Sequence, residues 1–262
     1  MTLGQSLNNN VRLALFGLCV SLAGCEREKA FSWINPPKQS IQGLQHHVVN
    51  SQYEKSQTGL SVLIPENYQE HPNTHYHVIY YLHGWGGNES SEISSIQEFI
   101  KRTLKHNGDM PIIVYPNGGR SGYFGPTENR ITQELIPYID SNFRTLKSRE
   151  GRHLLGFSMG GTAALRLALK YPQLFTSATS LGGRLWNGDN SLTEAININQ
   201  QKIKALKPKL LFIQGEQDGP NQFQAVTAKL ASHKIPFETK VLPNTSHDLA
   251  EYLEKSVIFY TQ

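Results

Sequence analysis

The chain has 262 residues, of which 38% are hydrophobic and 18% are charged, and its formal net charge at pH 7 is +4. This length is sufficient for one large α/β domain with a buried core, and the composition is that of a globular rather than a disordered protein. The net charge is small and the basic residues are scattered, which does not support a nucleic-acid-binding surface.

The first 25 residues differ from the rest of the chain. A short polar start with Arg12 precedes an apolar run over residues 13–23. This run is too short for a membrane-spanning helix, which needs roughly 20 residues, but it fits the apolar region of an export signal. It ends in Leu-Ala-Gly-Cys at residues 22–25, which resembles a bacterial lipobox. An ordinary signal peptide with a coincidental cysteine is the alternative interpretation.

The lipobox predicts that residues 1–24 are removed as a signal peptide and that Cys25 carries a diacylglycerol. We expect residues 25–40 to form a polar tether and residues 41–262 to form the folded domain. Cys19 would leave with the signal, so the mature protein would contain no disulfide.

The lipid on Cys25 predicts an anchor in the bacterial cell envelope. Glu26 follows the cysteine. An aspartate at that position is associated with retention in the inner membrane of some bacteria. Its absence favours the periplasmic side of the outer membrane.

After residue 44, strand-like and helix-like segments alternate. Buried strands are indicated by short apolar runs rich in β-branched and aromatic residues, and helices by apolar residues at helical spacing. The predicted strands cover residues 45–51, 59–65, 76–84, 110–119, 153–157, 175–181, 209–215 and 237–243, and the predicted helices cover residues 90–106, 128–143, 161–171, 223–233 and 247–260. This alternation predicts an α/β fold with a mostly parallel central sheet and helices on both faces. Ligands of such sheets bind at the carboxyl ends of strands, so catalytic residues should follow strands.

A candidate nucleophile lies in the sequence GFSMG at residues 156–160, which matches the G-x-S-x-G pattern of the nucleophile elbow in α/β-hydrolases. The pattern has a strand-like run before it and a helix-like run after it, as the elbow requires. The glycines allow the strand and the helix to approach closely, and the helix amino terminus favours negative charge. Ser158 is therefore the candidate nucleophile, and a glycine-rich turn with a surface serine is the alternative.

The sequence LHGWGG at residues 82–87 follows a predicted strand and is a candidate oxyanion-binding loop. In α/β-hydrolases, one donor comes from the loop after the third strand and the other from the residue after the serine. The backbone amides of Trp85 and Met159 are therefore the candidate donors. His83 and Gly84 are expected to lie at the substrate. We expect His83 to hold the shape of the loop by hydrogen bonds rather than to act as the base.

The acid and the base should follow the serine in the order Asp or Glu, then His. Glu216 and Asp218 both follow a predicted strand, and the residue pattern alone leaves both open as the acid. His247 follows the last predicted strand and precedes a helix, where the base is expected. His233 lies late in a helix, where a histidine interacts favourably with the helix dipole, and it is not favoured.

The motifs LHGWGG, GFSMGG, GEQD and SHD, in this order, resemble the serine esterase family that includes esterase D (S-formylglutathione hydrolase), feruloyl esterases and bacterial mycolyltransferases. The resemblance covers about residues 44–260. It implies the α/β-hydrolase fold, a triad with Asp218 as the acid, and an acyl-serine intermediate attacked by water or another alcohol. One departure is residues 244–246, before His247, where relatives often carry glycines.

Residues 182–205 form the longest polar stretch between predicted strands and are expected to form a short cap between strands six and seven. Trp186 in this segment is a candidate substrate contact, with a packed core tryptophan as the alternative. Tyr123, with Phe124, follows the fourth predicted strand and is a further candidate for the substrate site.

Together these features predict a serine carboxylesterase that hydrolyses a small or medium carboxylic ester. No metal is expected, because His71 and His75 flank Pro72 and cannot share a helix face, and no cofactor is expected. An acyltransferase or a serine peptidase on the same fold, and a non-catalytic envelope lipoprotein that binds a ligand, are the alternatives. The oligomeric state is left open.

Overall fold

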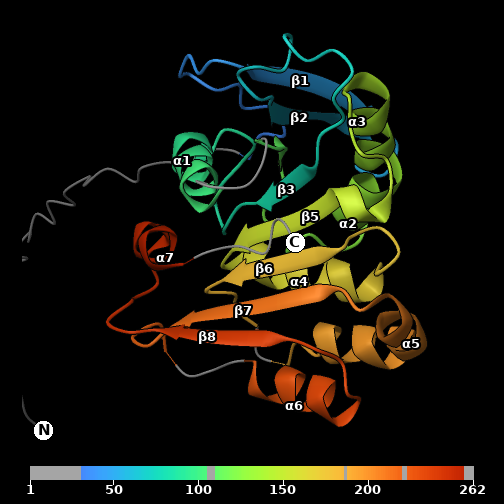
Figure 1. Cartoon of the computed structure of the whole chain (residues 1–262), viewed down its shortest axis with the longest axis vertical. Helices are drawn as coiled ribbons and strands as arrows, with labels where there is room; N and C mark the ends of the chain where they lie inside the picture. Colours follow the sequence, from blue (N-terminus) through green and yellow to red (C-terminus); the bar gives the residue numbers. More distant parts are fainter. Residues whose placement is uncertain (1–30, 105–109, 186–187, 220–222, 257–262) are drawn as a thin grey trace, which may run out of the picture. The chain divides into compact units, whose positions relative to one another are not determined.

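The computed structural model describes residues 31–104, 110–185, 188–219 and 223–256, and the folded unit begins at Ser32. Within these residues, eight strands form one sheet in the spatial order β1-β2-β4-β3-β5-β6-β7-β8 (Figure 1). The strands are β1 (Leu44–Ser51), β2 (Ser56–Leu63), β3 (Val78–Leu82), β4 (Ile112–Pro116), β5 (Arg152–Phe157), β6 (Ser177–Leu181), β7 (Lys209–Gly215) and β8 (Glu238–Leu242). β2 pairs antiparallel with β1 and β4, and the other neighbours pair in parallel. The predicted α/β fold with a mostly parallel sheet is confirmed.

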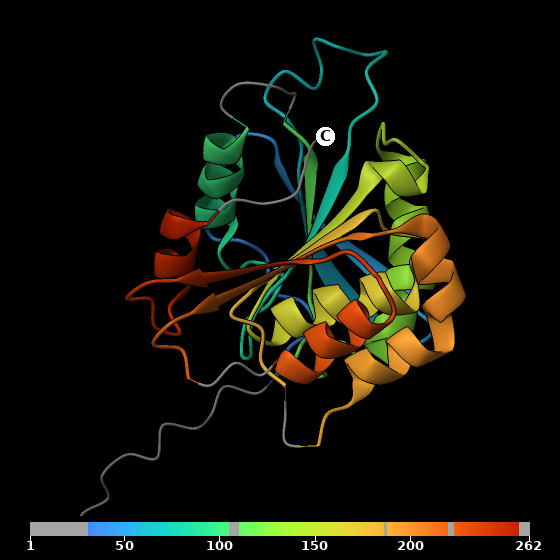
Figure 2. The same cartoon turned by 60° about the horizontal axis from the view of Figure 1, so that its bottom comes forward.

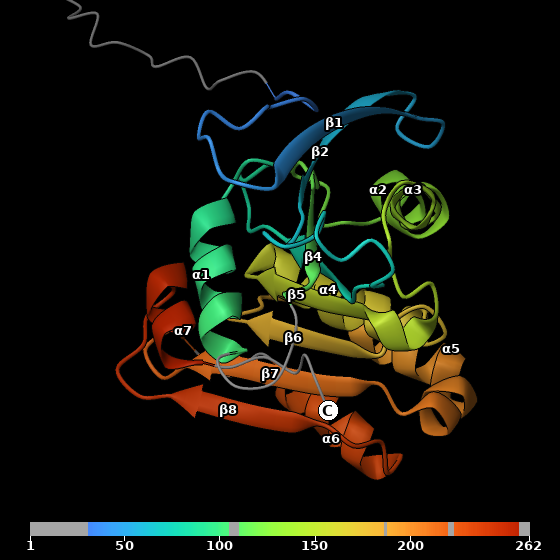
Figure 3. The same ribbon diagram turned by 45° about the horizontal axis from the view of Figure 1, so that its top comes forward.

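Helices cover both faces of the sheet, as Figure 2 shows. On one face lie α2 (Pro126–Asn129), a π-helical turn (Arg130–Leu135), α3 (Ile136–Asn142), α4 (Met159–Lys170), α5 (Ser191–Leu206) and α6 (Gln224–Ser232). On the other face, α1 (Ile93–Thr103) and α7 (Leu249–Lys255) lie side by side (Figure 3). The two layers bury two separate apolar clusters, which explains why the central strands are apolar at nearly every position.

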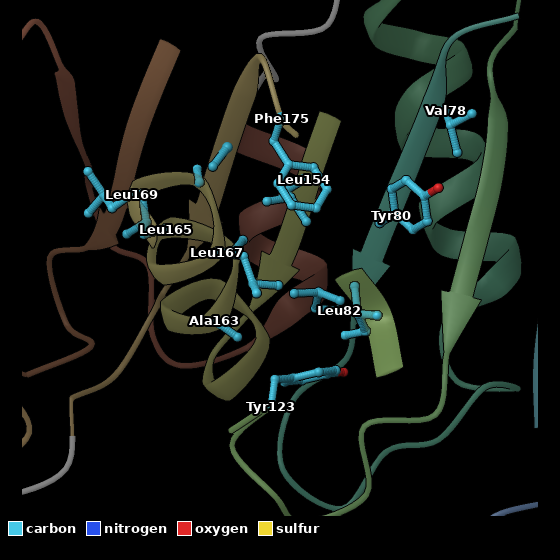
Figure 4. Packing of buried hydrophobic residues seen from close by; sticks show 14 of the residues in the cluster. Val78, Tyr80, Leu82, Tyr123, Leu154, Ala163, Leu165, Leu167, Leu169 and Phe175 are labelled. Carbon is cyan, nitrogen blue, oxygen red and sulfur yellow. The ribbon is translucent and has the colours of Figure 1, made fainter. Parts of the chain in front are cut away.

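The central strands send alternate side chains into these two clusters. In β3, Tyr80 and Leu82 face the α4 side, whereas Ile79 and Tyr81 face the α1 side. Figure 4 shows side chains of β3 and β5 meeting those of α4, the helix that follows Ser158. Every residue of α4 except its last is buried, so this helix is held firmly against the sheet.

The polar segment between β6 and β7 contains a helix that the sequence analysis does not predict. α5 buries Leu192, Ala195, Ile196 and Ile203, which lie on one face at helical spacing, and it packs against α4. The helix therefore covers the sheet. The part of the expected cap that precedes it is residues 182–190, of which 186 and 187 lie outside the described residues.

Residues 32–40, which the sequence analysis assigns to a tether, lie against the domain. The backbone amide of Asn35 donates to the carboxylate of Glu89, which is fully buried and also accepts a 2.8 Å hydrogen bond from Asn117 Nδ2. The Trp33 carbonyl oxygen accepts a 2.7 Å hydrogen bond from the Gly59 amide. The folded domain therefore starts before residue 41. Residues 1–24 and Cys25 lie outside the described residues.

A pair of histidines at the amino ends of β3 and β5 predicts that acid weakens the fold. His77 Nδ1 lies 3.0 Å from His153 Nε2, and His153 Nδ1 lies 2.8 Å from Ser177 Oγ. Burial lowers the pKa of His153 to about 3 and also lowers the pKa of His77. The unfolded chain, in which a histidine has a pKa of about 6.5, therefore binds more protons than the folded chain in the interval between these values.

We expect the free energy of unfolding to decrease as the pH falls from about 6.5 towards 3, and His153→Gln to reduce this dependence. Urea denaturation at a series of pH values measures it. His71→Gln is the matched control, because His71 is exposed and its replacement should leave the slope unchanged. Equal slopes in the wild type and His153→Gln would contradict the prediction.

Candidate active site

Ser158 alone makes the turn between β5 and α4. β5 ends at Phe157 and α4 begins at Met159, and Ser158 has φ 54° and ψ −118°, a conformation that non-glycine residues rarely adopt. Such a conformation costs about 1–3 kcal/mol and persists only where the surroundings impose it. Here the Ser158 amide donates to the Leu181 carbonyl oxygen at 2.9 Å, and the Ser158 carbonyl oxygen accepts from the Thr162 amide at 3.1 Å.

The glycines beside the serine permit this turn. A Cβ atom on Gly160 would overlap the Leu82 carbonyl oxygen, and a Cβ atom on Gly156 would overlap the Gly160 carbonyl oxygen. Both neighbours are backbone atoms, which cannot move aside without displacing a strand or the helix. The close approach of strand and helix that the sequence analysis expects from these glycines is therefore present.

A continuous set of hydrogen bonds joins three residues that are distant in the sequence. Ser158 Oγ lies 2.9 Å from His247 Nε2, and His247 Nδ1 lies 2.9 Å from Asp218 Oδ2. The Asp218 side chain is fully buried, whereas the His247 side chain is 30% exposed. A carboxylate only accepts hydrogen bonds, so Nδ1 carries the imidazole proton and Nε2 is left to accept the serine proton.

The two carboxylates that follow β7 have different partners. Asp218 contacts His247, whereas Glu216 Oε2 accepts a 3.0 Å hydrogen bond from the Asn244 amide. Of the two residues left open by the residue pattern, Asp218 is therefore the one that reaches the imidazole, in agreement with the family resemblance.

The loop before His247 is shaped without glycine. Asn244 has φ 48°, a left-handed conformation that asparagine tolerates better than most residues. The Ser246 amide donates to Glu251 Oε2 at 2.7 Å, and the Thr245 carbonyl oxygen accepts from the Gln217 amide at 2.9 Å. These bonds tie the loop to α7 and to the end of β7, so the departure from the family pattern leaves His247 well placed.

Two aromatic residues that the sequence analysis did not select hold the acid and the base. The Phe157 ring stacks on the His247 ring, with centroids 4.9 Å apart and an interplanar angle of 26°. The Tyr252 hydroxyl donates to Asp218 Oδ2 at 2.5 Å and accepts from the Gly215 amide at 2.6 Å. Burial raises the pKa of Tyr252, which keeps its hydroxyl protonated as a donor. Neither aromatic carries a sequence signal, because both occupy ordinary apolar positions of a strand and a helix.

Arg184 is a third neighbour of the acid that the sequence analysis did not select. Its guanidinium forms an ion pair with Asp218 Oδ1 and donates to the Asp218 carbonyl oxygen at 3.2 Å. Its Nε lies 3.3 Å from His247 Nδ1. In the sequence, Arg184 lies in the segment assigned to the cap, and nothing in that pattern links it to the triad.

The candidate oxyanion loop lies beside the serine. A Cβ atom on Gly84 would lie 3.5 Å from Ser158 Cβ and 3.2 Å from Phe157 Cδ1, so this loop passes the serine closely. Met159 is the first residue of α4, and the amides of a first helical turn have no acceptor within the helix. Gly84, which precedes the predicted donor Trp85, thus passes close to Ser158, and the predicted donor Met159 directly follows the serine.

The side chain of His83 turns inward from the candidate oxyanion loop and does not reach the surface, contrary to the expected substrate contact. It is 1% exposed, its Nδ1 lies 2.7 Å from the Gly84 carbonyl oxygen, and its Nε2 accepts a 2.9 Å hydrogen bond from the Gly118 amide. Burial lowers its pKa to about 4, so the ring is neutral at pH 7. His83 therefore joins the loop of Gly84 to the loop of Gly118, which agrees with the expectation that its hydrogen bonds hold the shape of the loop.

Tyr123 is also buried rather than open to a substrate. It is 0% exposed, and its hydroxyl donates to the His83 carbonyl oxygen at 3.3 Å. Phe124 is 38% exposed, and the Arg166 guanidinium lies 3.6 Å from the centroid of its ring. Trp186 lies outside the described residues. Within the described part of the chain, no group of three potential metal ligands occurs, and no helix has the length and apolar character needed to cross a membrane.

The chain belongs to the Esterase family, whose model matches residues 51–225, more than half of the sequence. This confirms the predicted resemblance. Ser158 and Asp218 lie within the matched range, and His247 lies beyond it.

An esterase of Mycobacterium tuberculosis strain H37Rv is 36% identical over 135 residues, which cover 48% of this chain and 29% of that protein. A mycolyltransferase of Mycobacterium leprae is 29% identical over 124 residues, which cover 42% of this chain and 36% of that protein. The chain thus spans less than half the length of these curated relatives.

Two solved structures share the fold. A ferulic acid esterase from the anaerobic fungus Anaeromyces mucronatus superimposes with a TM-score of 0.69 at 20% identity, covering 85% of this chain and 91% of that one. An S-formylglutathione hydrolase from Staphylococcus aureus superimposes with a TM-score of 0.64 at 22% identity, covering 82% of this chain and 96% of that one. At this identity, the likeness establishes the fold alone.

The hydrogen bonds of Tyr252 predict a measurable effect on stability. Tyr252→Phe removes one acceptor of the Gly215 amide and one donor to Asp218. Leaving buried polar groups without partners should lower the free energy of unfolding by about 1–3 kcal/mol, measured by urea denaturation. Tyr138→Phe is the matched control, since its hydroxyl bonds only partly buried His47, and we expect a smaller loss. Equal losses would count against the importance of the buried contact.

Proposed function

We propose that this protein is a serine carboxylesterase that hydrolyses a small or medium carboxylic ester through an acyl-serine intermediate. The observation that carries the proposal is the unbroken set of hydrogen bonds from Ser158 through His247 to buried Asp218. Membership of the Esterase family and the names of the relatives agree with it.

In the first half of the reaction, Ser158 Oγ attacks the carbonyl carbon of the ester, and His247 Nε2 takes the hydroxyl proton. The carbonyl oxygen gains negative charge and accepts hydrogen bonds from the Trp85 and Met159 amides. Each such donor contributes on the order of 3 kcal/mol to the transition state. When the tetrahedral intermediate collapses, the bond to the alcohol oxygen breaks and His247 returns the proton to that oxygen, which leaves the acyl-serine.

In the second half, water replaces the alcohol. His247 Nε2 takes one proton from water as its oxygen attacks the acyl carbon, and the proton then passes to Ser158 Oγ as the acid is released. Asp218 holds the imidazole in the tautomer that accepts at Nε2 and stabilises its charged form. The stacked Phe157 ring restricts the imidazole to this orientation.

Acyl transfer is the second candidate, because the same acyl-serine reacts with an alcohol in place of water and a mycolyltransferase is among the relatives. Product analysis with an added alcohol distinguishes the two: an esterase releases free acid, whereas a transferase forms a new ester. A serine peptidase would cleave a peptide substrate at a comparable rate, and a non-catalytic binding lipoprotein would not react with a fluorophosphonate probe.

Replacing the nucleophile tests the proposal. We expect Ser158→Ala to reduce kcat/KM on p-nitrophenyl acetate and butyrate by about four to six powers of ten, because the serine and its base act as a unit. It should also abolish fluorophosphonate labelling. Ser141→Ala is the matched control: Ser141 is exposed and its hydroxyl bonds the Pro137 carbonyl oxygen within α3, so this variant should keep the wild-type rate. Equal hydrolysis by wild type and Ser158→Ala would overturn the proposal.

The proposal includes a lipid anchor on Cys25 that holds the protein at the periplasmic side of the outer membrane. It rests on the lipobox-like residues 22–25 after the apolar run. In a Gram-negative host grown with labelled palmitate, the full chain should take up label and fractionate with membranes, and Cys25→Ser should do neither. Cys19→Ser, within the signal, is the matched control and should still be labelled. Label retained in Cys25→Ser would exclude the anchor.

A further inference from the structure

We propose that Arg184 is a positioning residue that sets the acidic limit of the reaction, that is, the pH below which the rate falls. This proposal rests on the function proposed above. Its positive charge lies against the acid and the base of the triad at once. Through this placement it opposes a second positive charge on the His247 ring, so the triad remains active at lower pH than it would without the arginine.

The contacts of Arg184 converge on the triad. Its terminal nitrogen pairs with Asp218 Oδ1 and donates to the Asp218 carbonyl oxygen at 3.2 Å, and its Nε lies 3.3 Å from His247 Nδ1. Asp218 Oδ2 accepts from Tyr252, and His247 Nδ1 lies 2.8 Å from Oδ1 and 2.9 Å from Oδ2. The guanidinium therefore lies beside the hydrogen bond that joins the imidazole to the carboxylate, on the side of the ring away from Ser158.

The two glycines before Arg184 allow its backbone to pass close to Asp218. Gly182 has φ 52°, and a Cβ atom on it would lie 2.9 Å from Asp218 Oδ2 and 2.8 Å from Tyr252 Cζ. A Cβ atom on Gly183 would overlap Ser180 Oγ. The Arg184 carbonyl oxygen accepts a 2.7 Å hydrogen bond from Thr162 Oγ1 on α4. The two glycines thus let the chain pass directly over the acid, and α4 fixes the arginine backbone.

The electrostatic consequence follows from the charges. A cation beside an imidazole disfavours the imidazolium, and a cation beside a carboxylate favours its ionised form. Asp218 favours the imidazolium, so Arg184 offsets part of the stabilisation that this carboxylate gives. Among the described residues, the other charged or titratable groups next to His247 are Tyr252 and Glu251 on α7 and the adjacent Asp248. Glu251 binds the Ser246 amide, and Asp248 accepts from the Ala250 amide. Arg184 is the cation that these contacts bring to the imidazole.

The proposal is tested by the pH profile of kcat/KM on a neutral p-nitrophenyl ester. We expect Arg184→Met to move the midpoint of the acidic limb to higher pH by about one unit, because a cation beside the imidazole disfavours the imidazolium, and the 43% exposure of the arginine side chain limits the effect. Arg184→Lys should restore at least half of this shift. The rate on the alkaline plateau should fall as well, because Arg184→Met removes an ion pair and a hydrogen bond that hold Asp218, but this loss alone does not move the limb.

Lys101→Met is the control for the loss of one positive charge. Lys101, near the carboxyl end of α1, pairs with Glu66 at 2.9 Å. Glu66 follows the end of β2 at Leu63, and Leu63 pairs with Ile113 near the amino end of β4. Lys101 therefore lies at the amino ends of the parallel strands, opposite the carboxyl ends that carry the triad, where screening by solvent removes the effect of its exposed charge on His247. Its acidic limb should coincide with that of the wild type.

Two results would overturn the proposal. One is an unchanged acidic limb in Arg184→Met with a lower plateau, which would assign Arg184 a structural role only. The other is a higher KM for a carboxylate-bearing ester with an unchanged limb on the neutral ester, which would assign it to substrate binding. If no ester is turned over, the function proposed above fails. In that case, the titration of His247 is followed by NMR in the wild type and in Arg184→Met, with its signal assigned by comparison with His247→Gln. A higher midpoint in Arg184→Met would support the proposal without any measurement of activity, and an equal midpoint would contradict it.

Discussion

The conformation of Ser158 is the constraint on which the rest of the site depends. A non-glycine residue at φ 54° and ψ −118° is unfavourable, and it persists because β5 and α4 are both fixed in the core. α4 is buried along nearly its whole length, and Gly156 and Gly160 let it approach the strands more closely than any side chain would permit. The packing of the core thus supplies the energy that holds the serine hydroxyl at the edge of the sheet.

A second constraint comes from burial of the Asp218 carboxylate. A buried charge is strongly unfavourable unless hydrogen bonds and opposite charge compensate it. His247, Tyr252 and Arg184 provide that compensation from the loop before α7, from α7 and from the loop after β6, respectively. The acid is therefore held from several directions, which fixes the imidazole that bonds to it and reserves Nε2 for the serine.

The sequence predicts the sheet and the three aligned residues because their signals are local. Parallel strands buried on both faces are continuous apolar runs, and the elbow needs glycines at fixed positions around Ser158. The sequence does not predict the residues that surround the acid, because Tyr252 and Arg184 lie in separate elements and are brought to Asp218 only by the topology of the fold. Tyr123 and His83 follow strands and are therefore candidates for the substrate site, yet both turn inward to hold loops, as the expected hydrogen bonds of His83 imply. Residues 32–40 look like a linker because their contacts, such as Asn35 with Glu89, are polar.

The two sides of the site respond to acid in different ways. The loop that carries Gly84 depends on neutral His83, whose pKa of about 4 keeps its Nε2 available as the acceptor of the Gly118 amide through mildly acidic conditions. At the amino ends of the strands, the hydrogen bonds between His77, His153 and Ser177 depend on His153, whose ring stays neutral to a still lower pH. The acid–base side depends instead on charges, namely ionised Asp218 and the guanidinium of Arg184. The hydrogen bonds of His83 and His153 therefore persist below pH 6.5, the range in which an ordinary histidine gains a proton, although holding these rings neutral there lowers the free energy of unfolding.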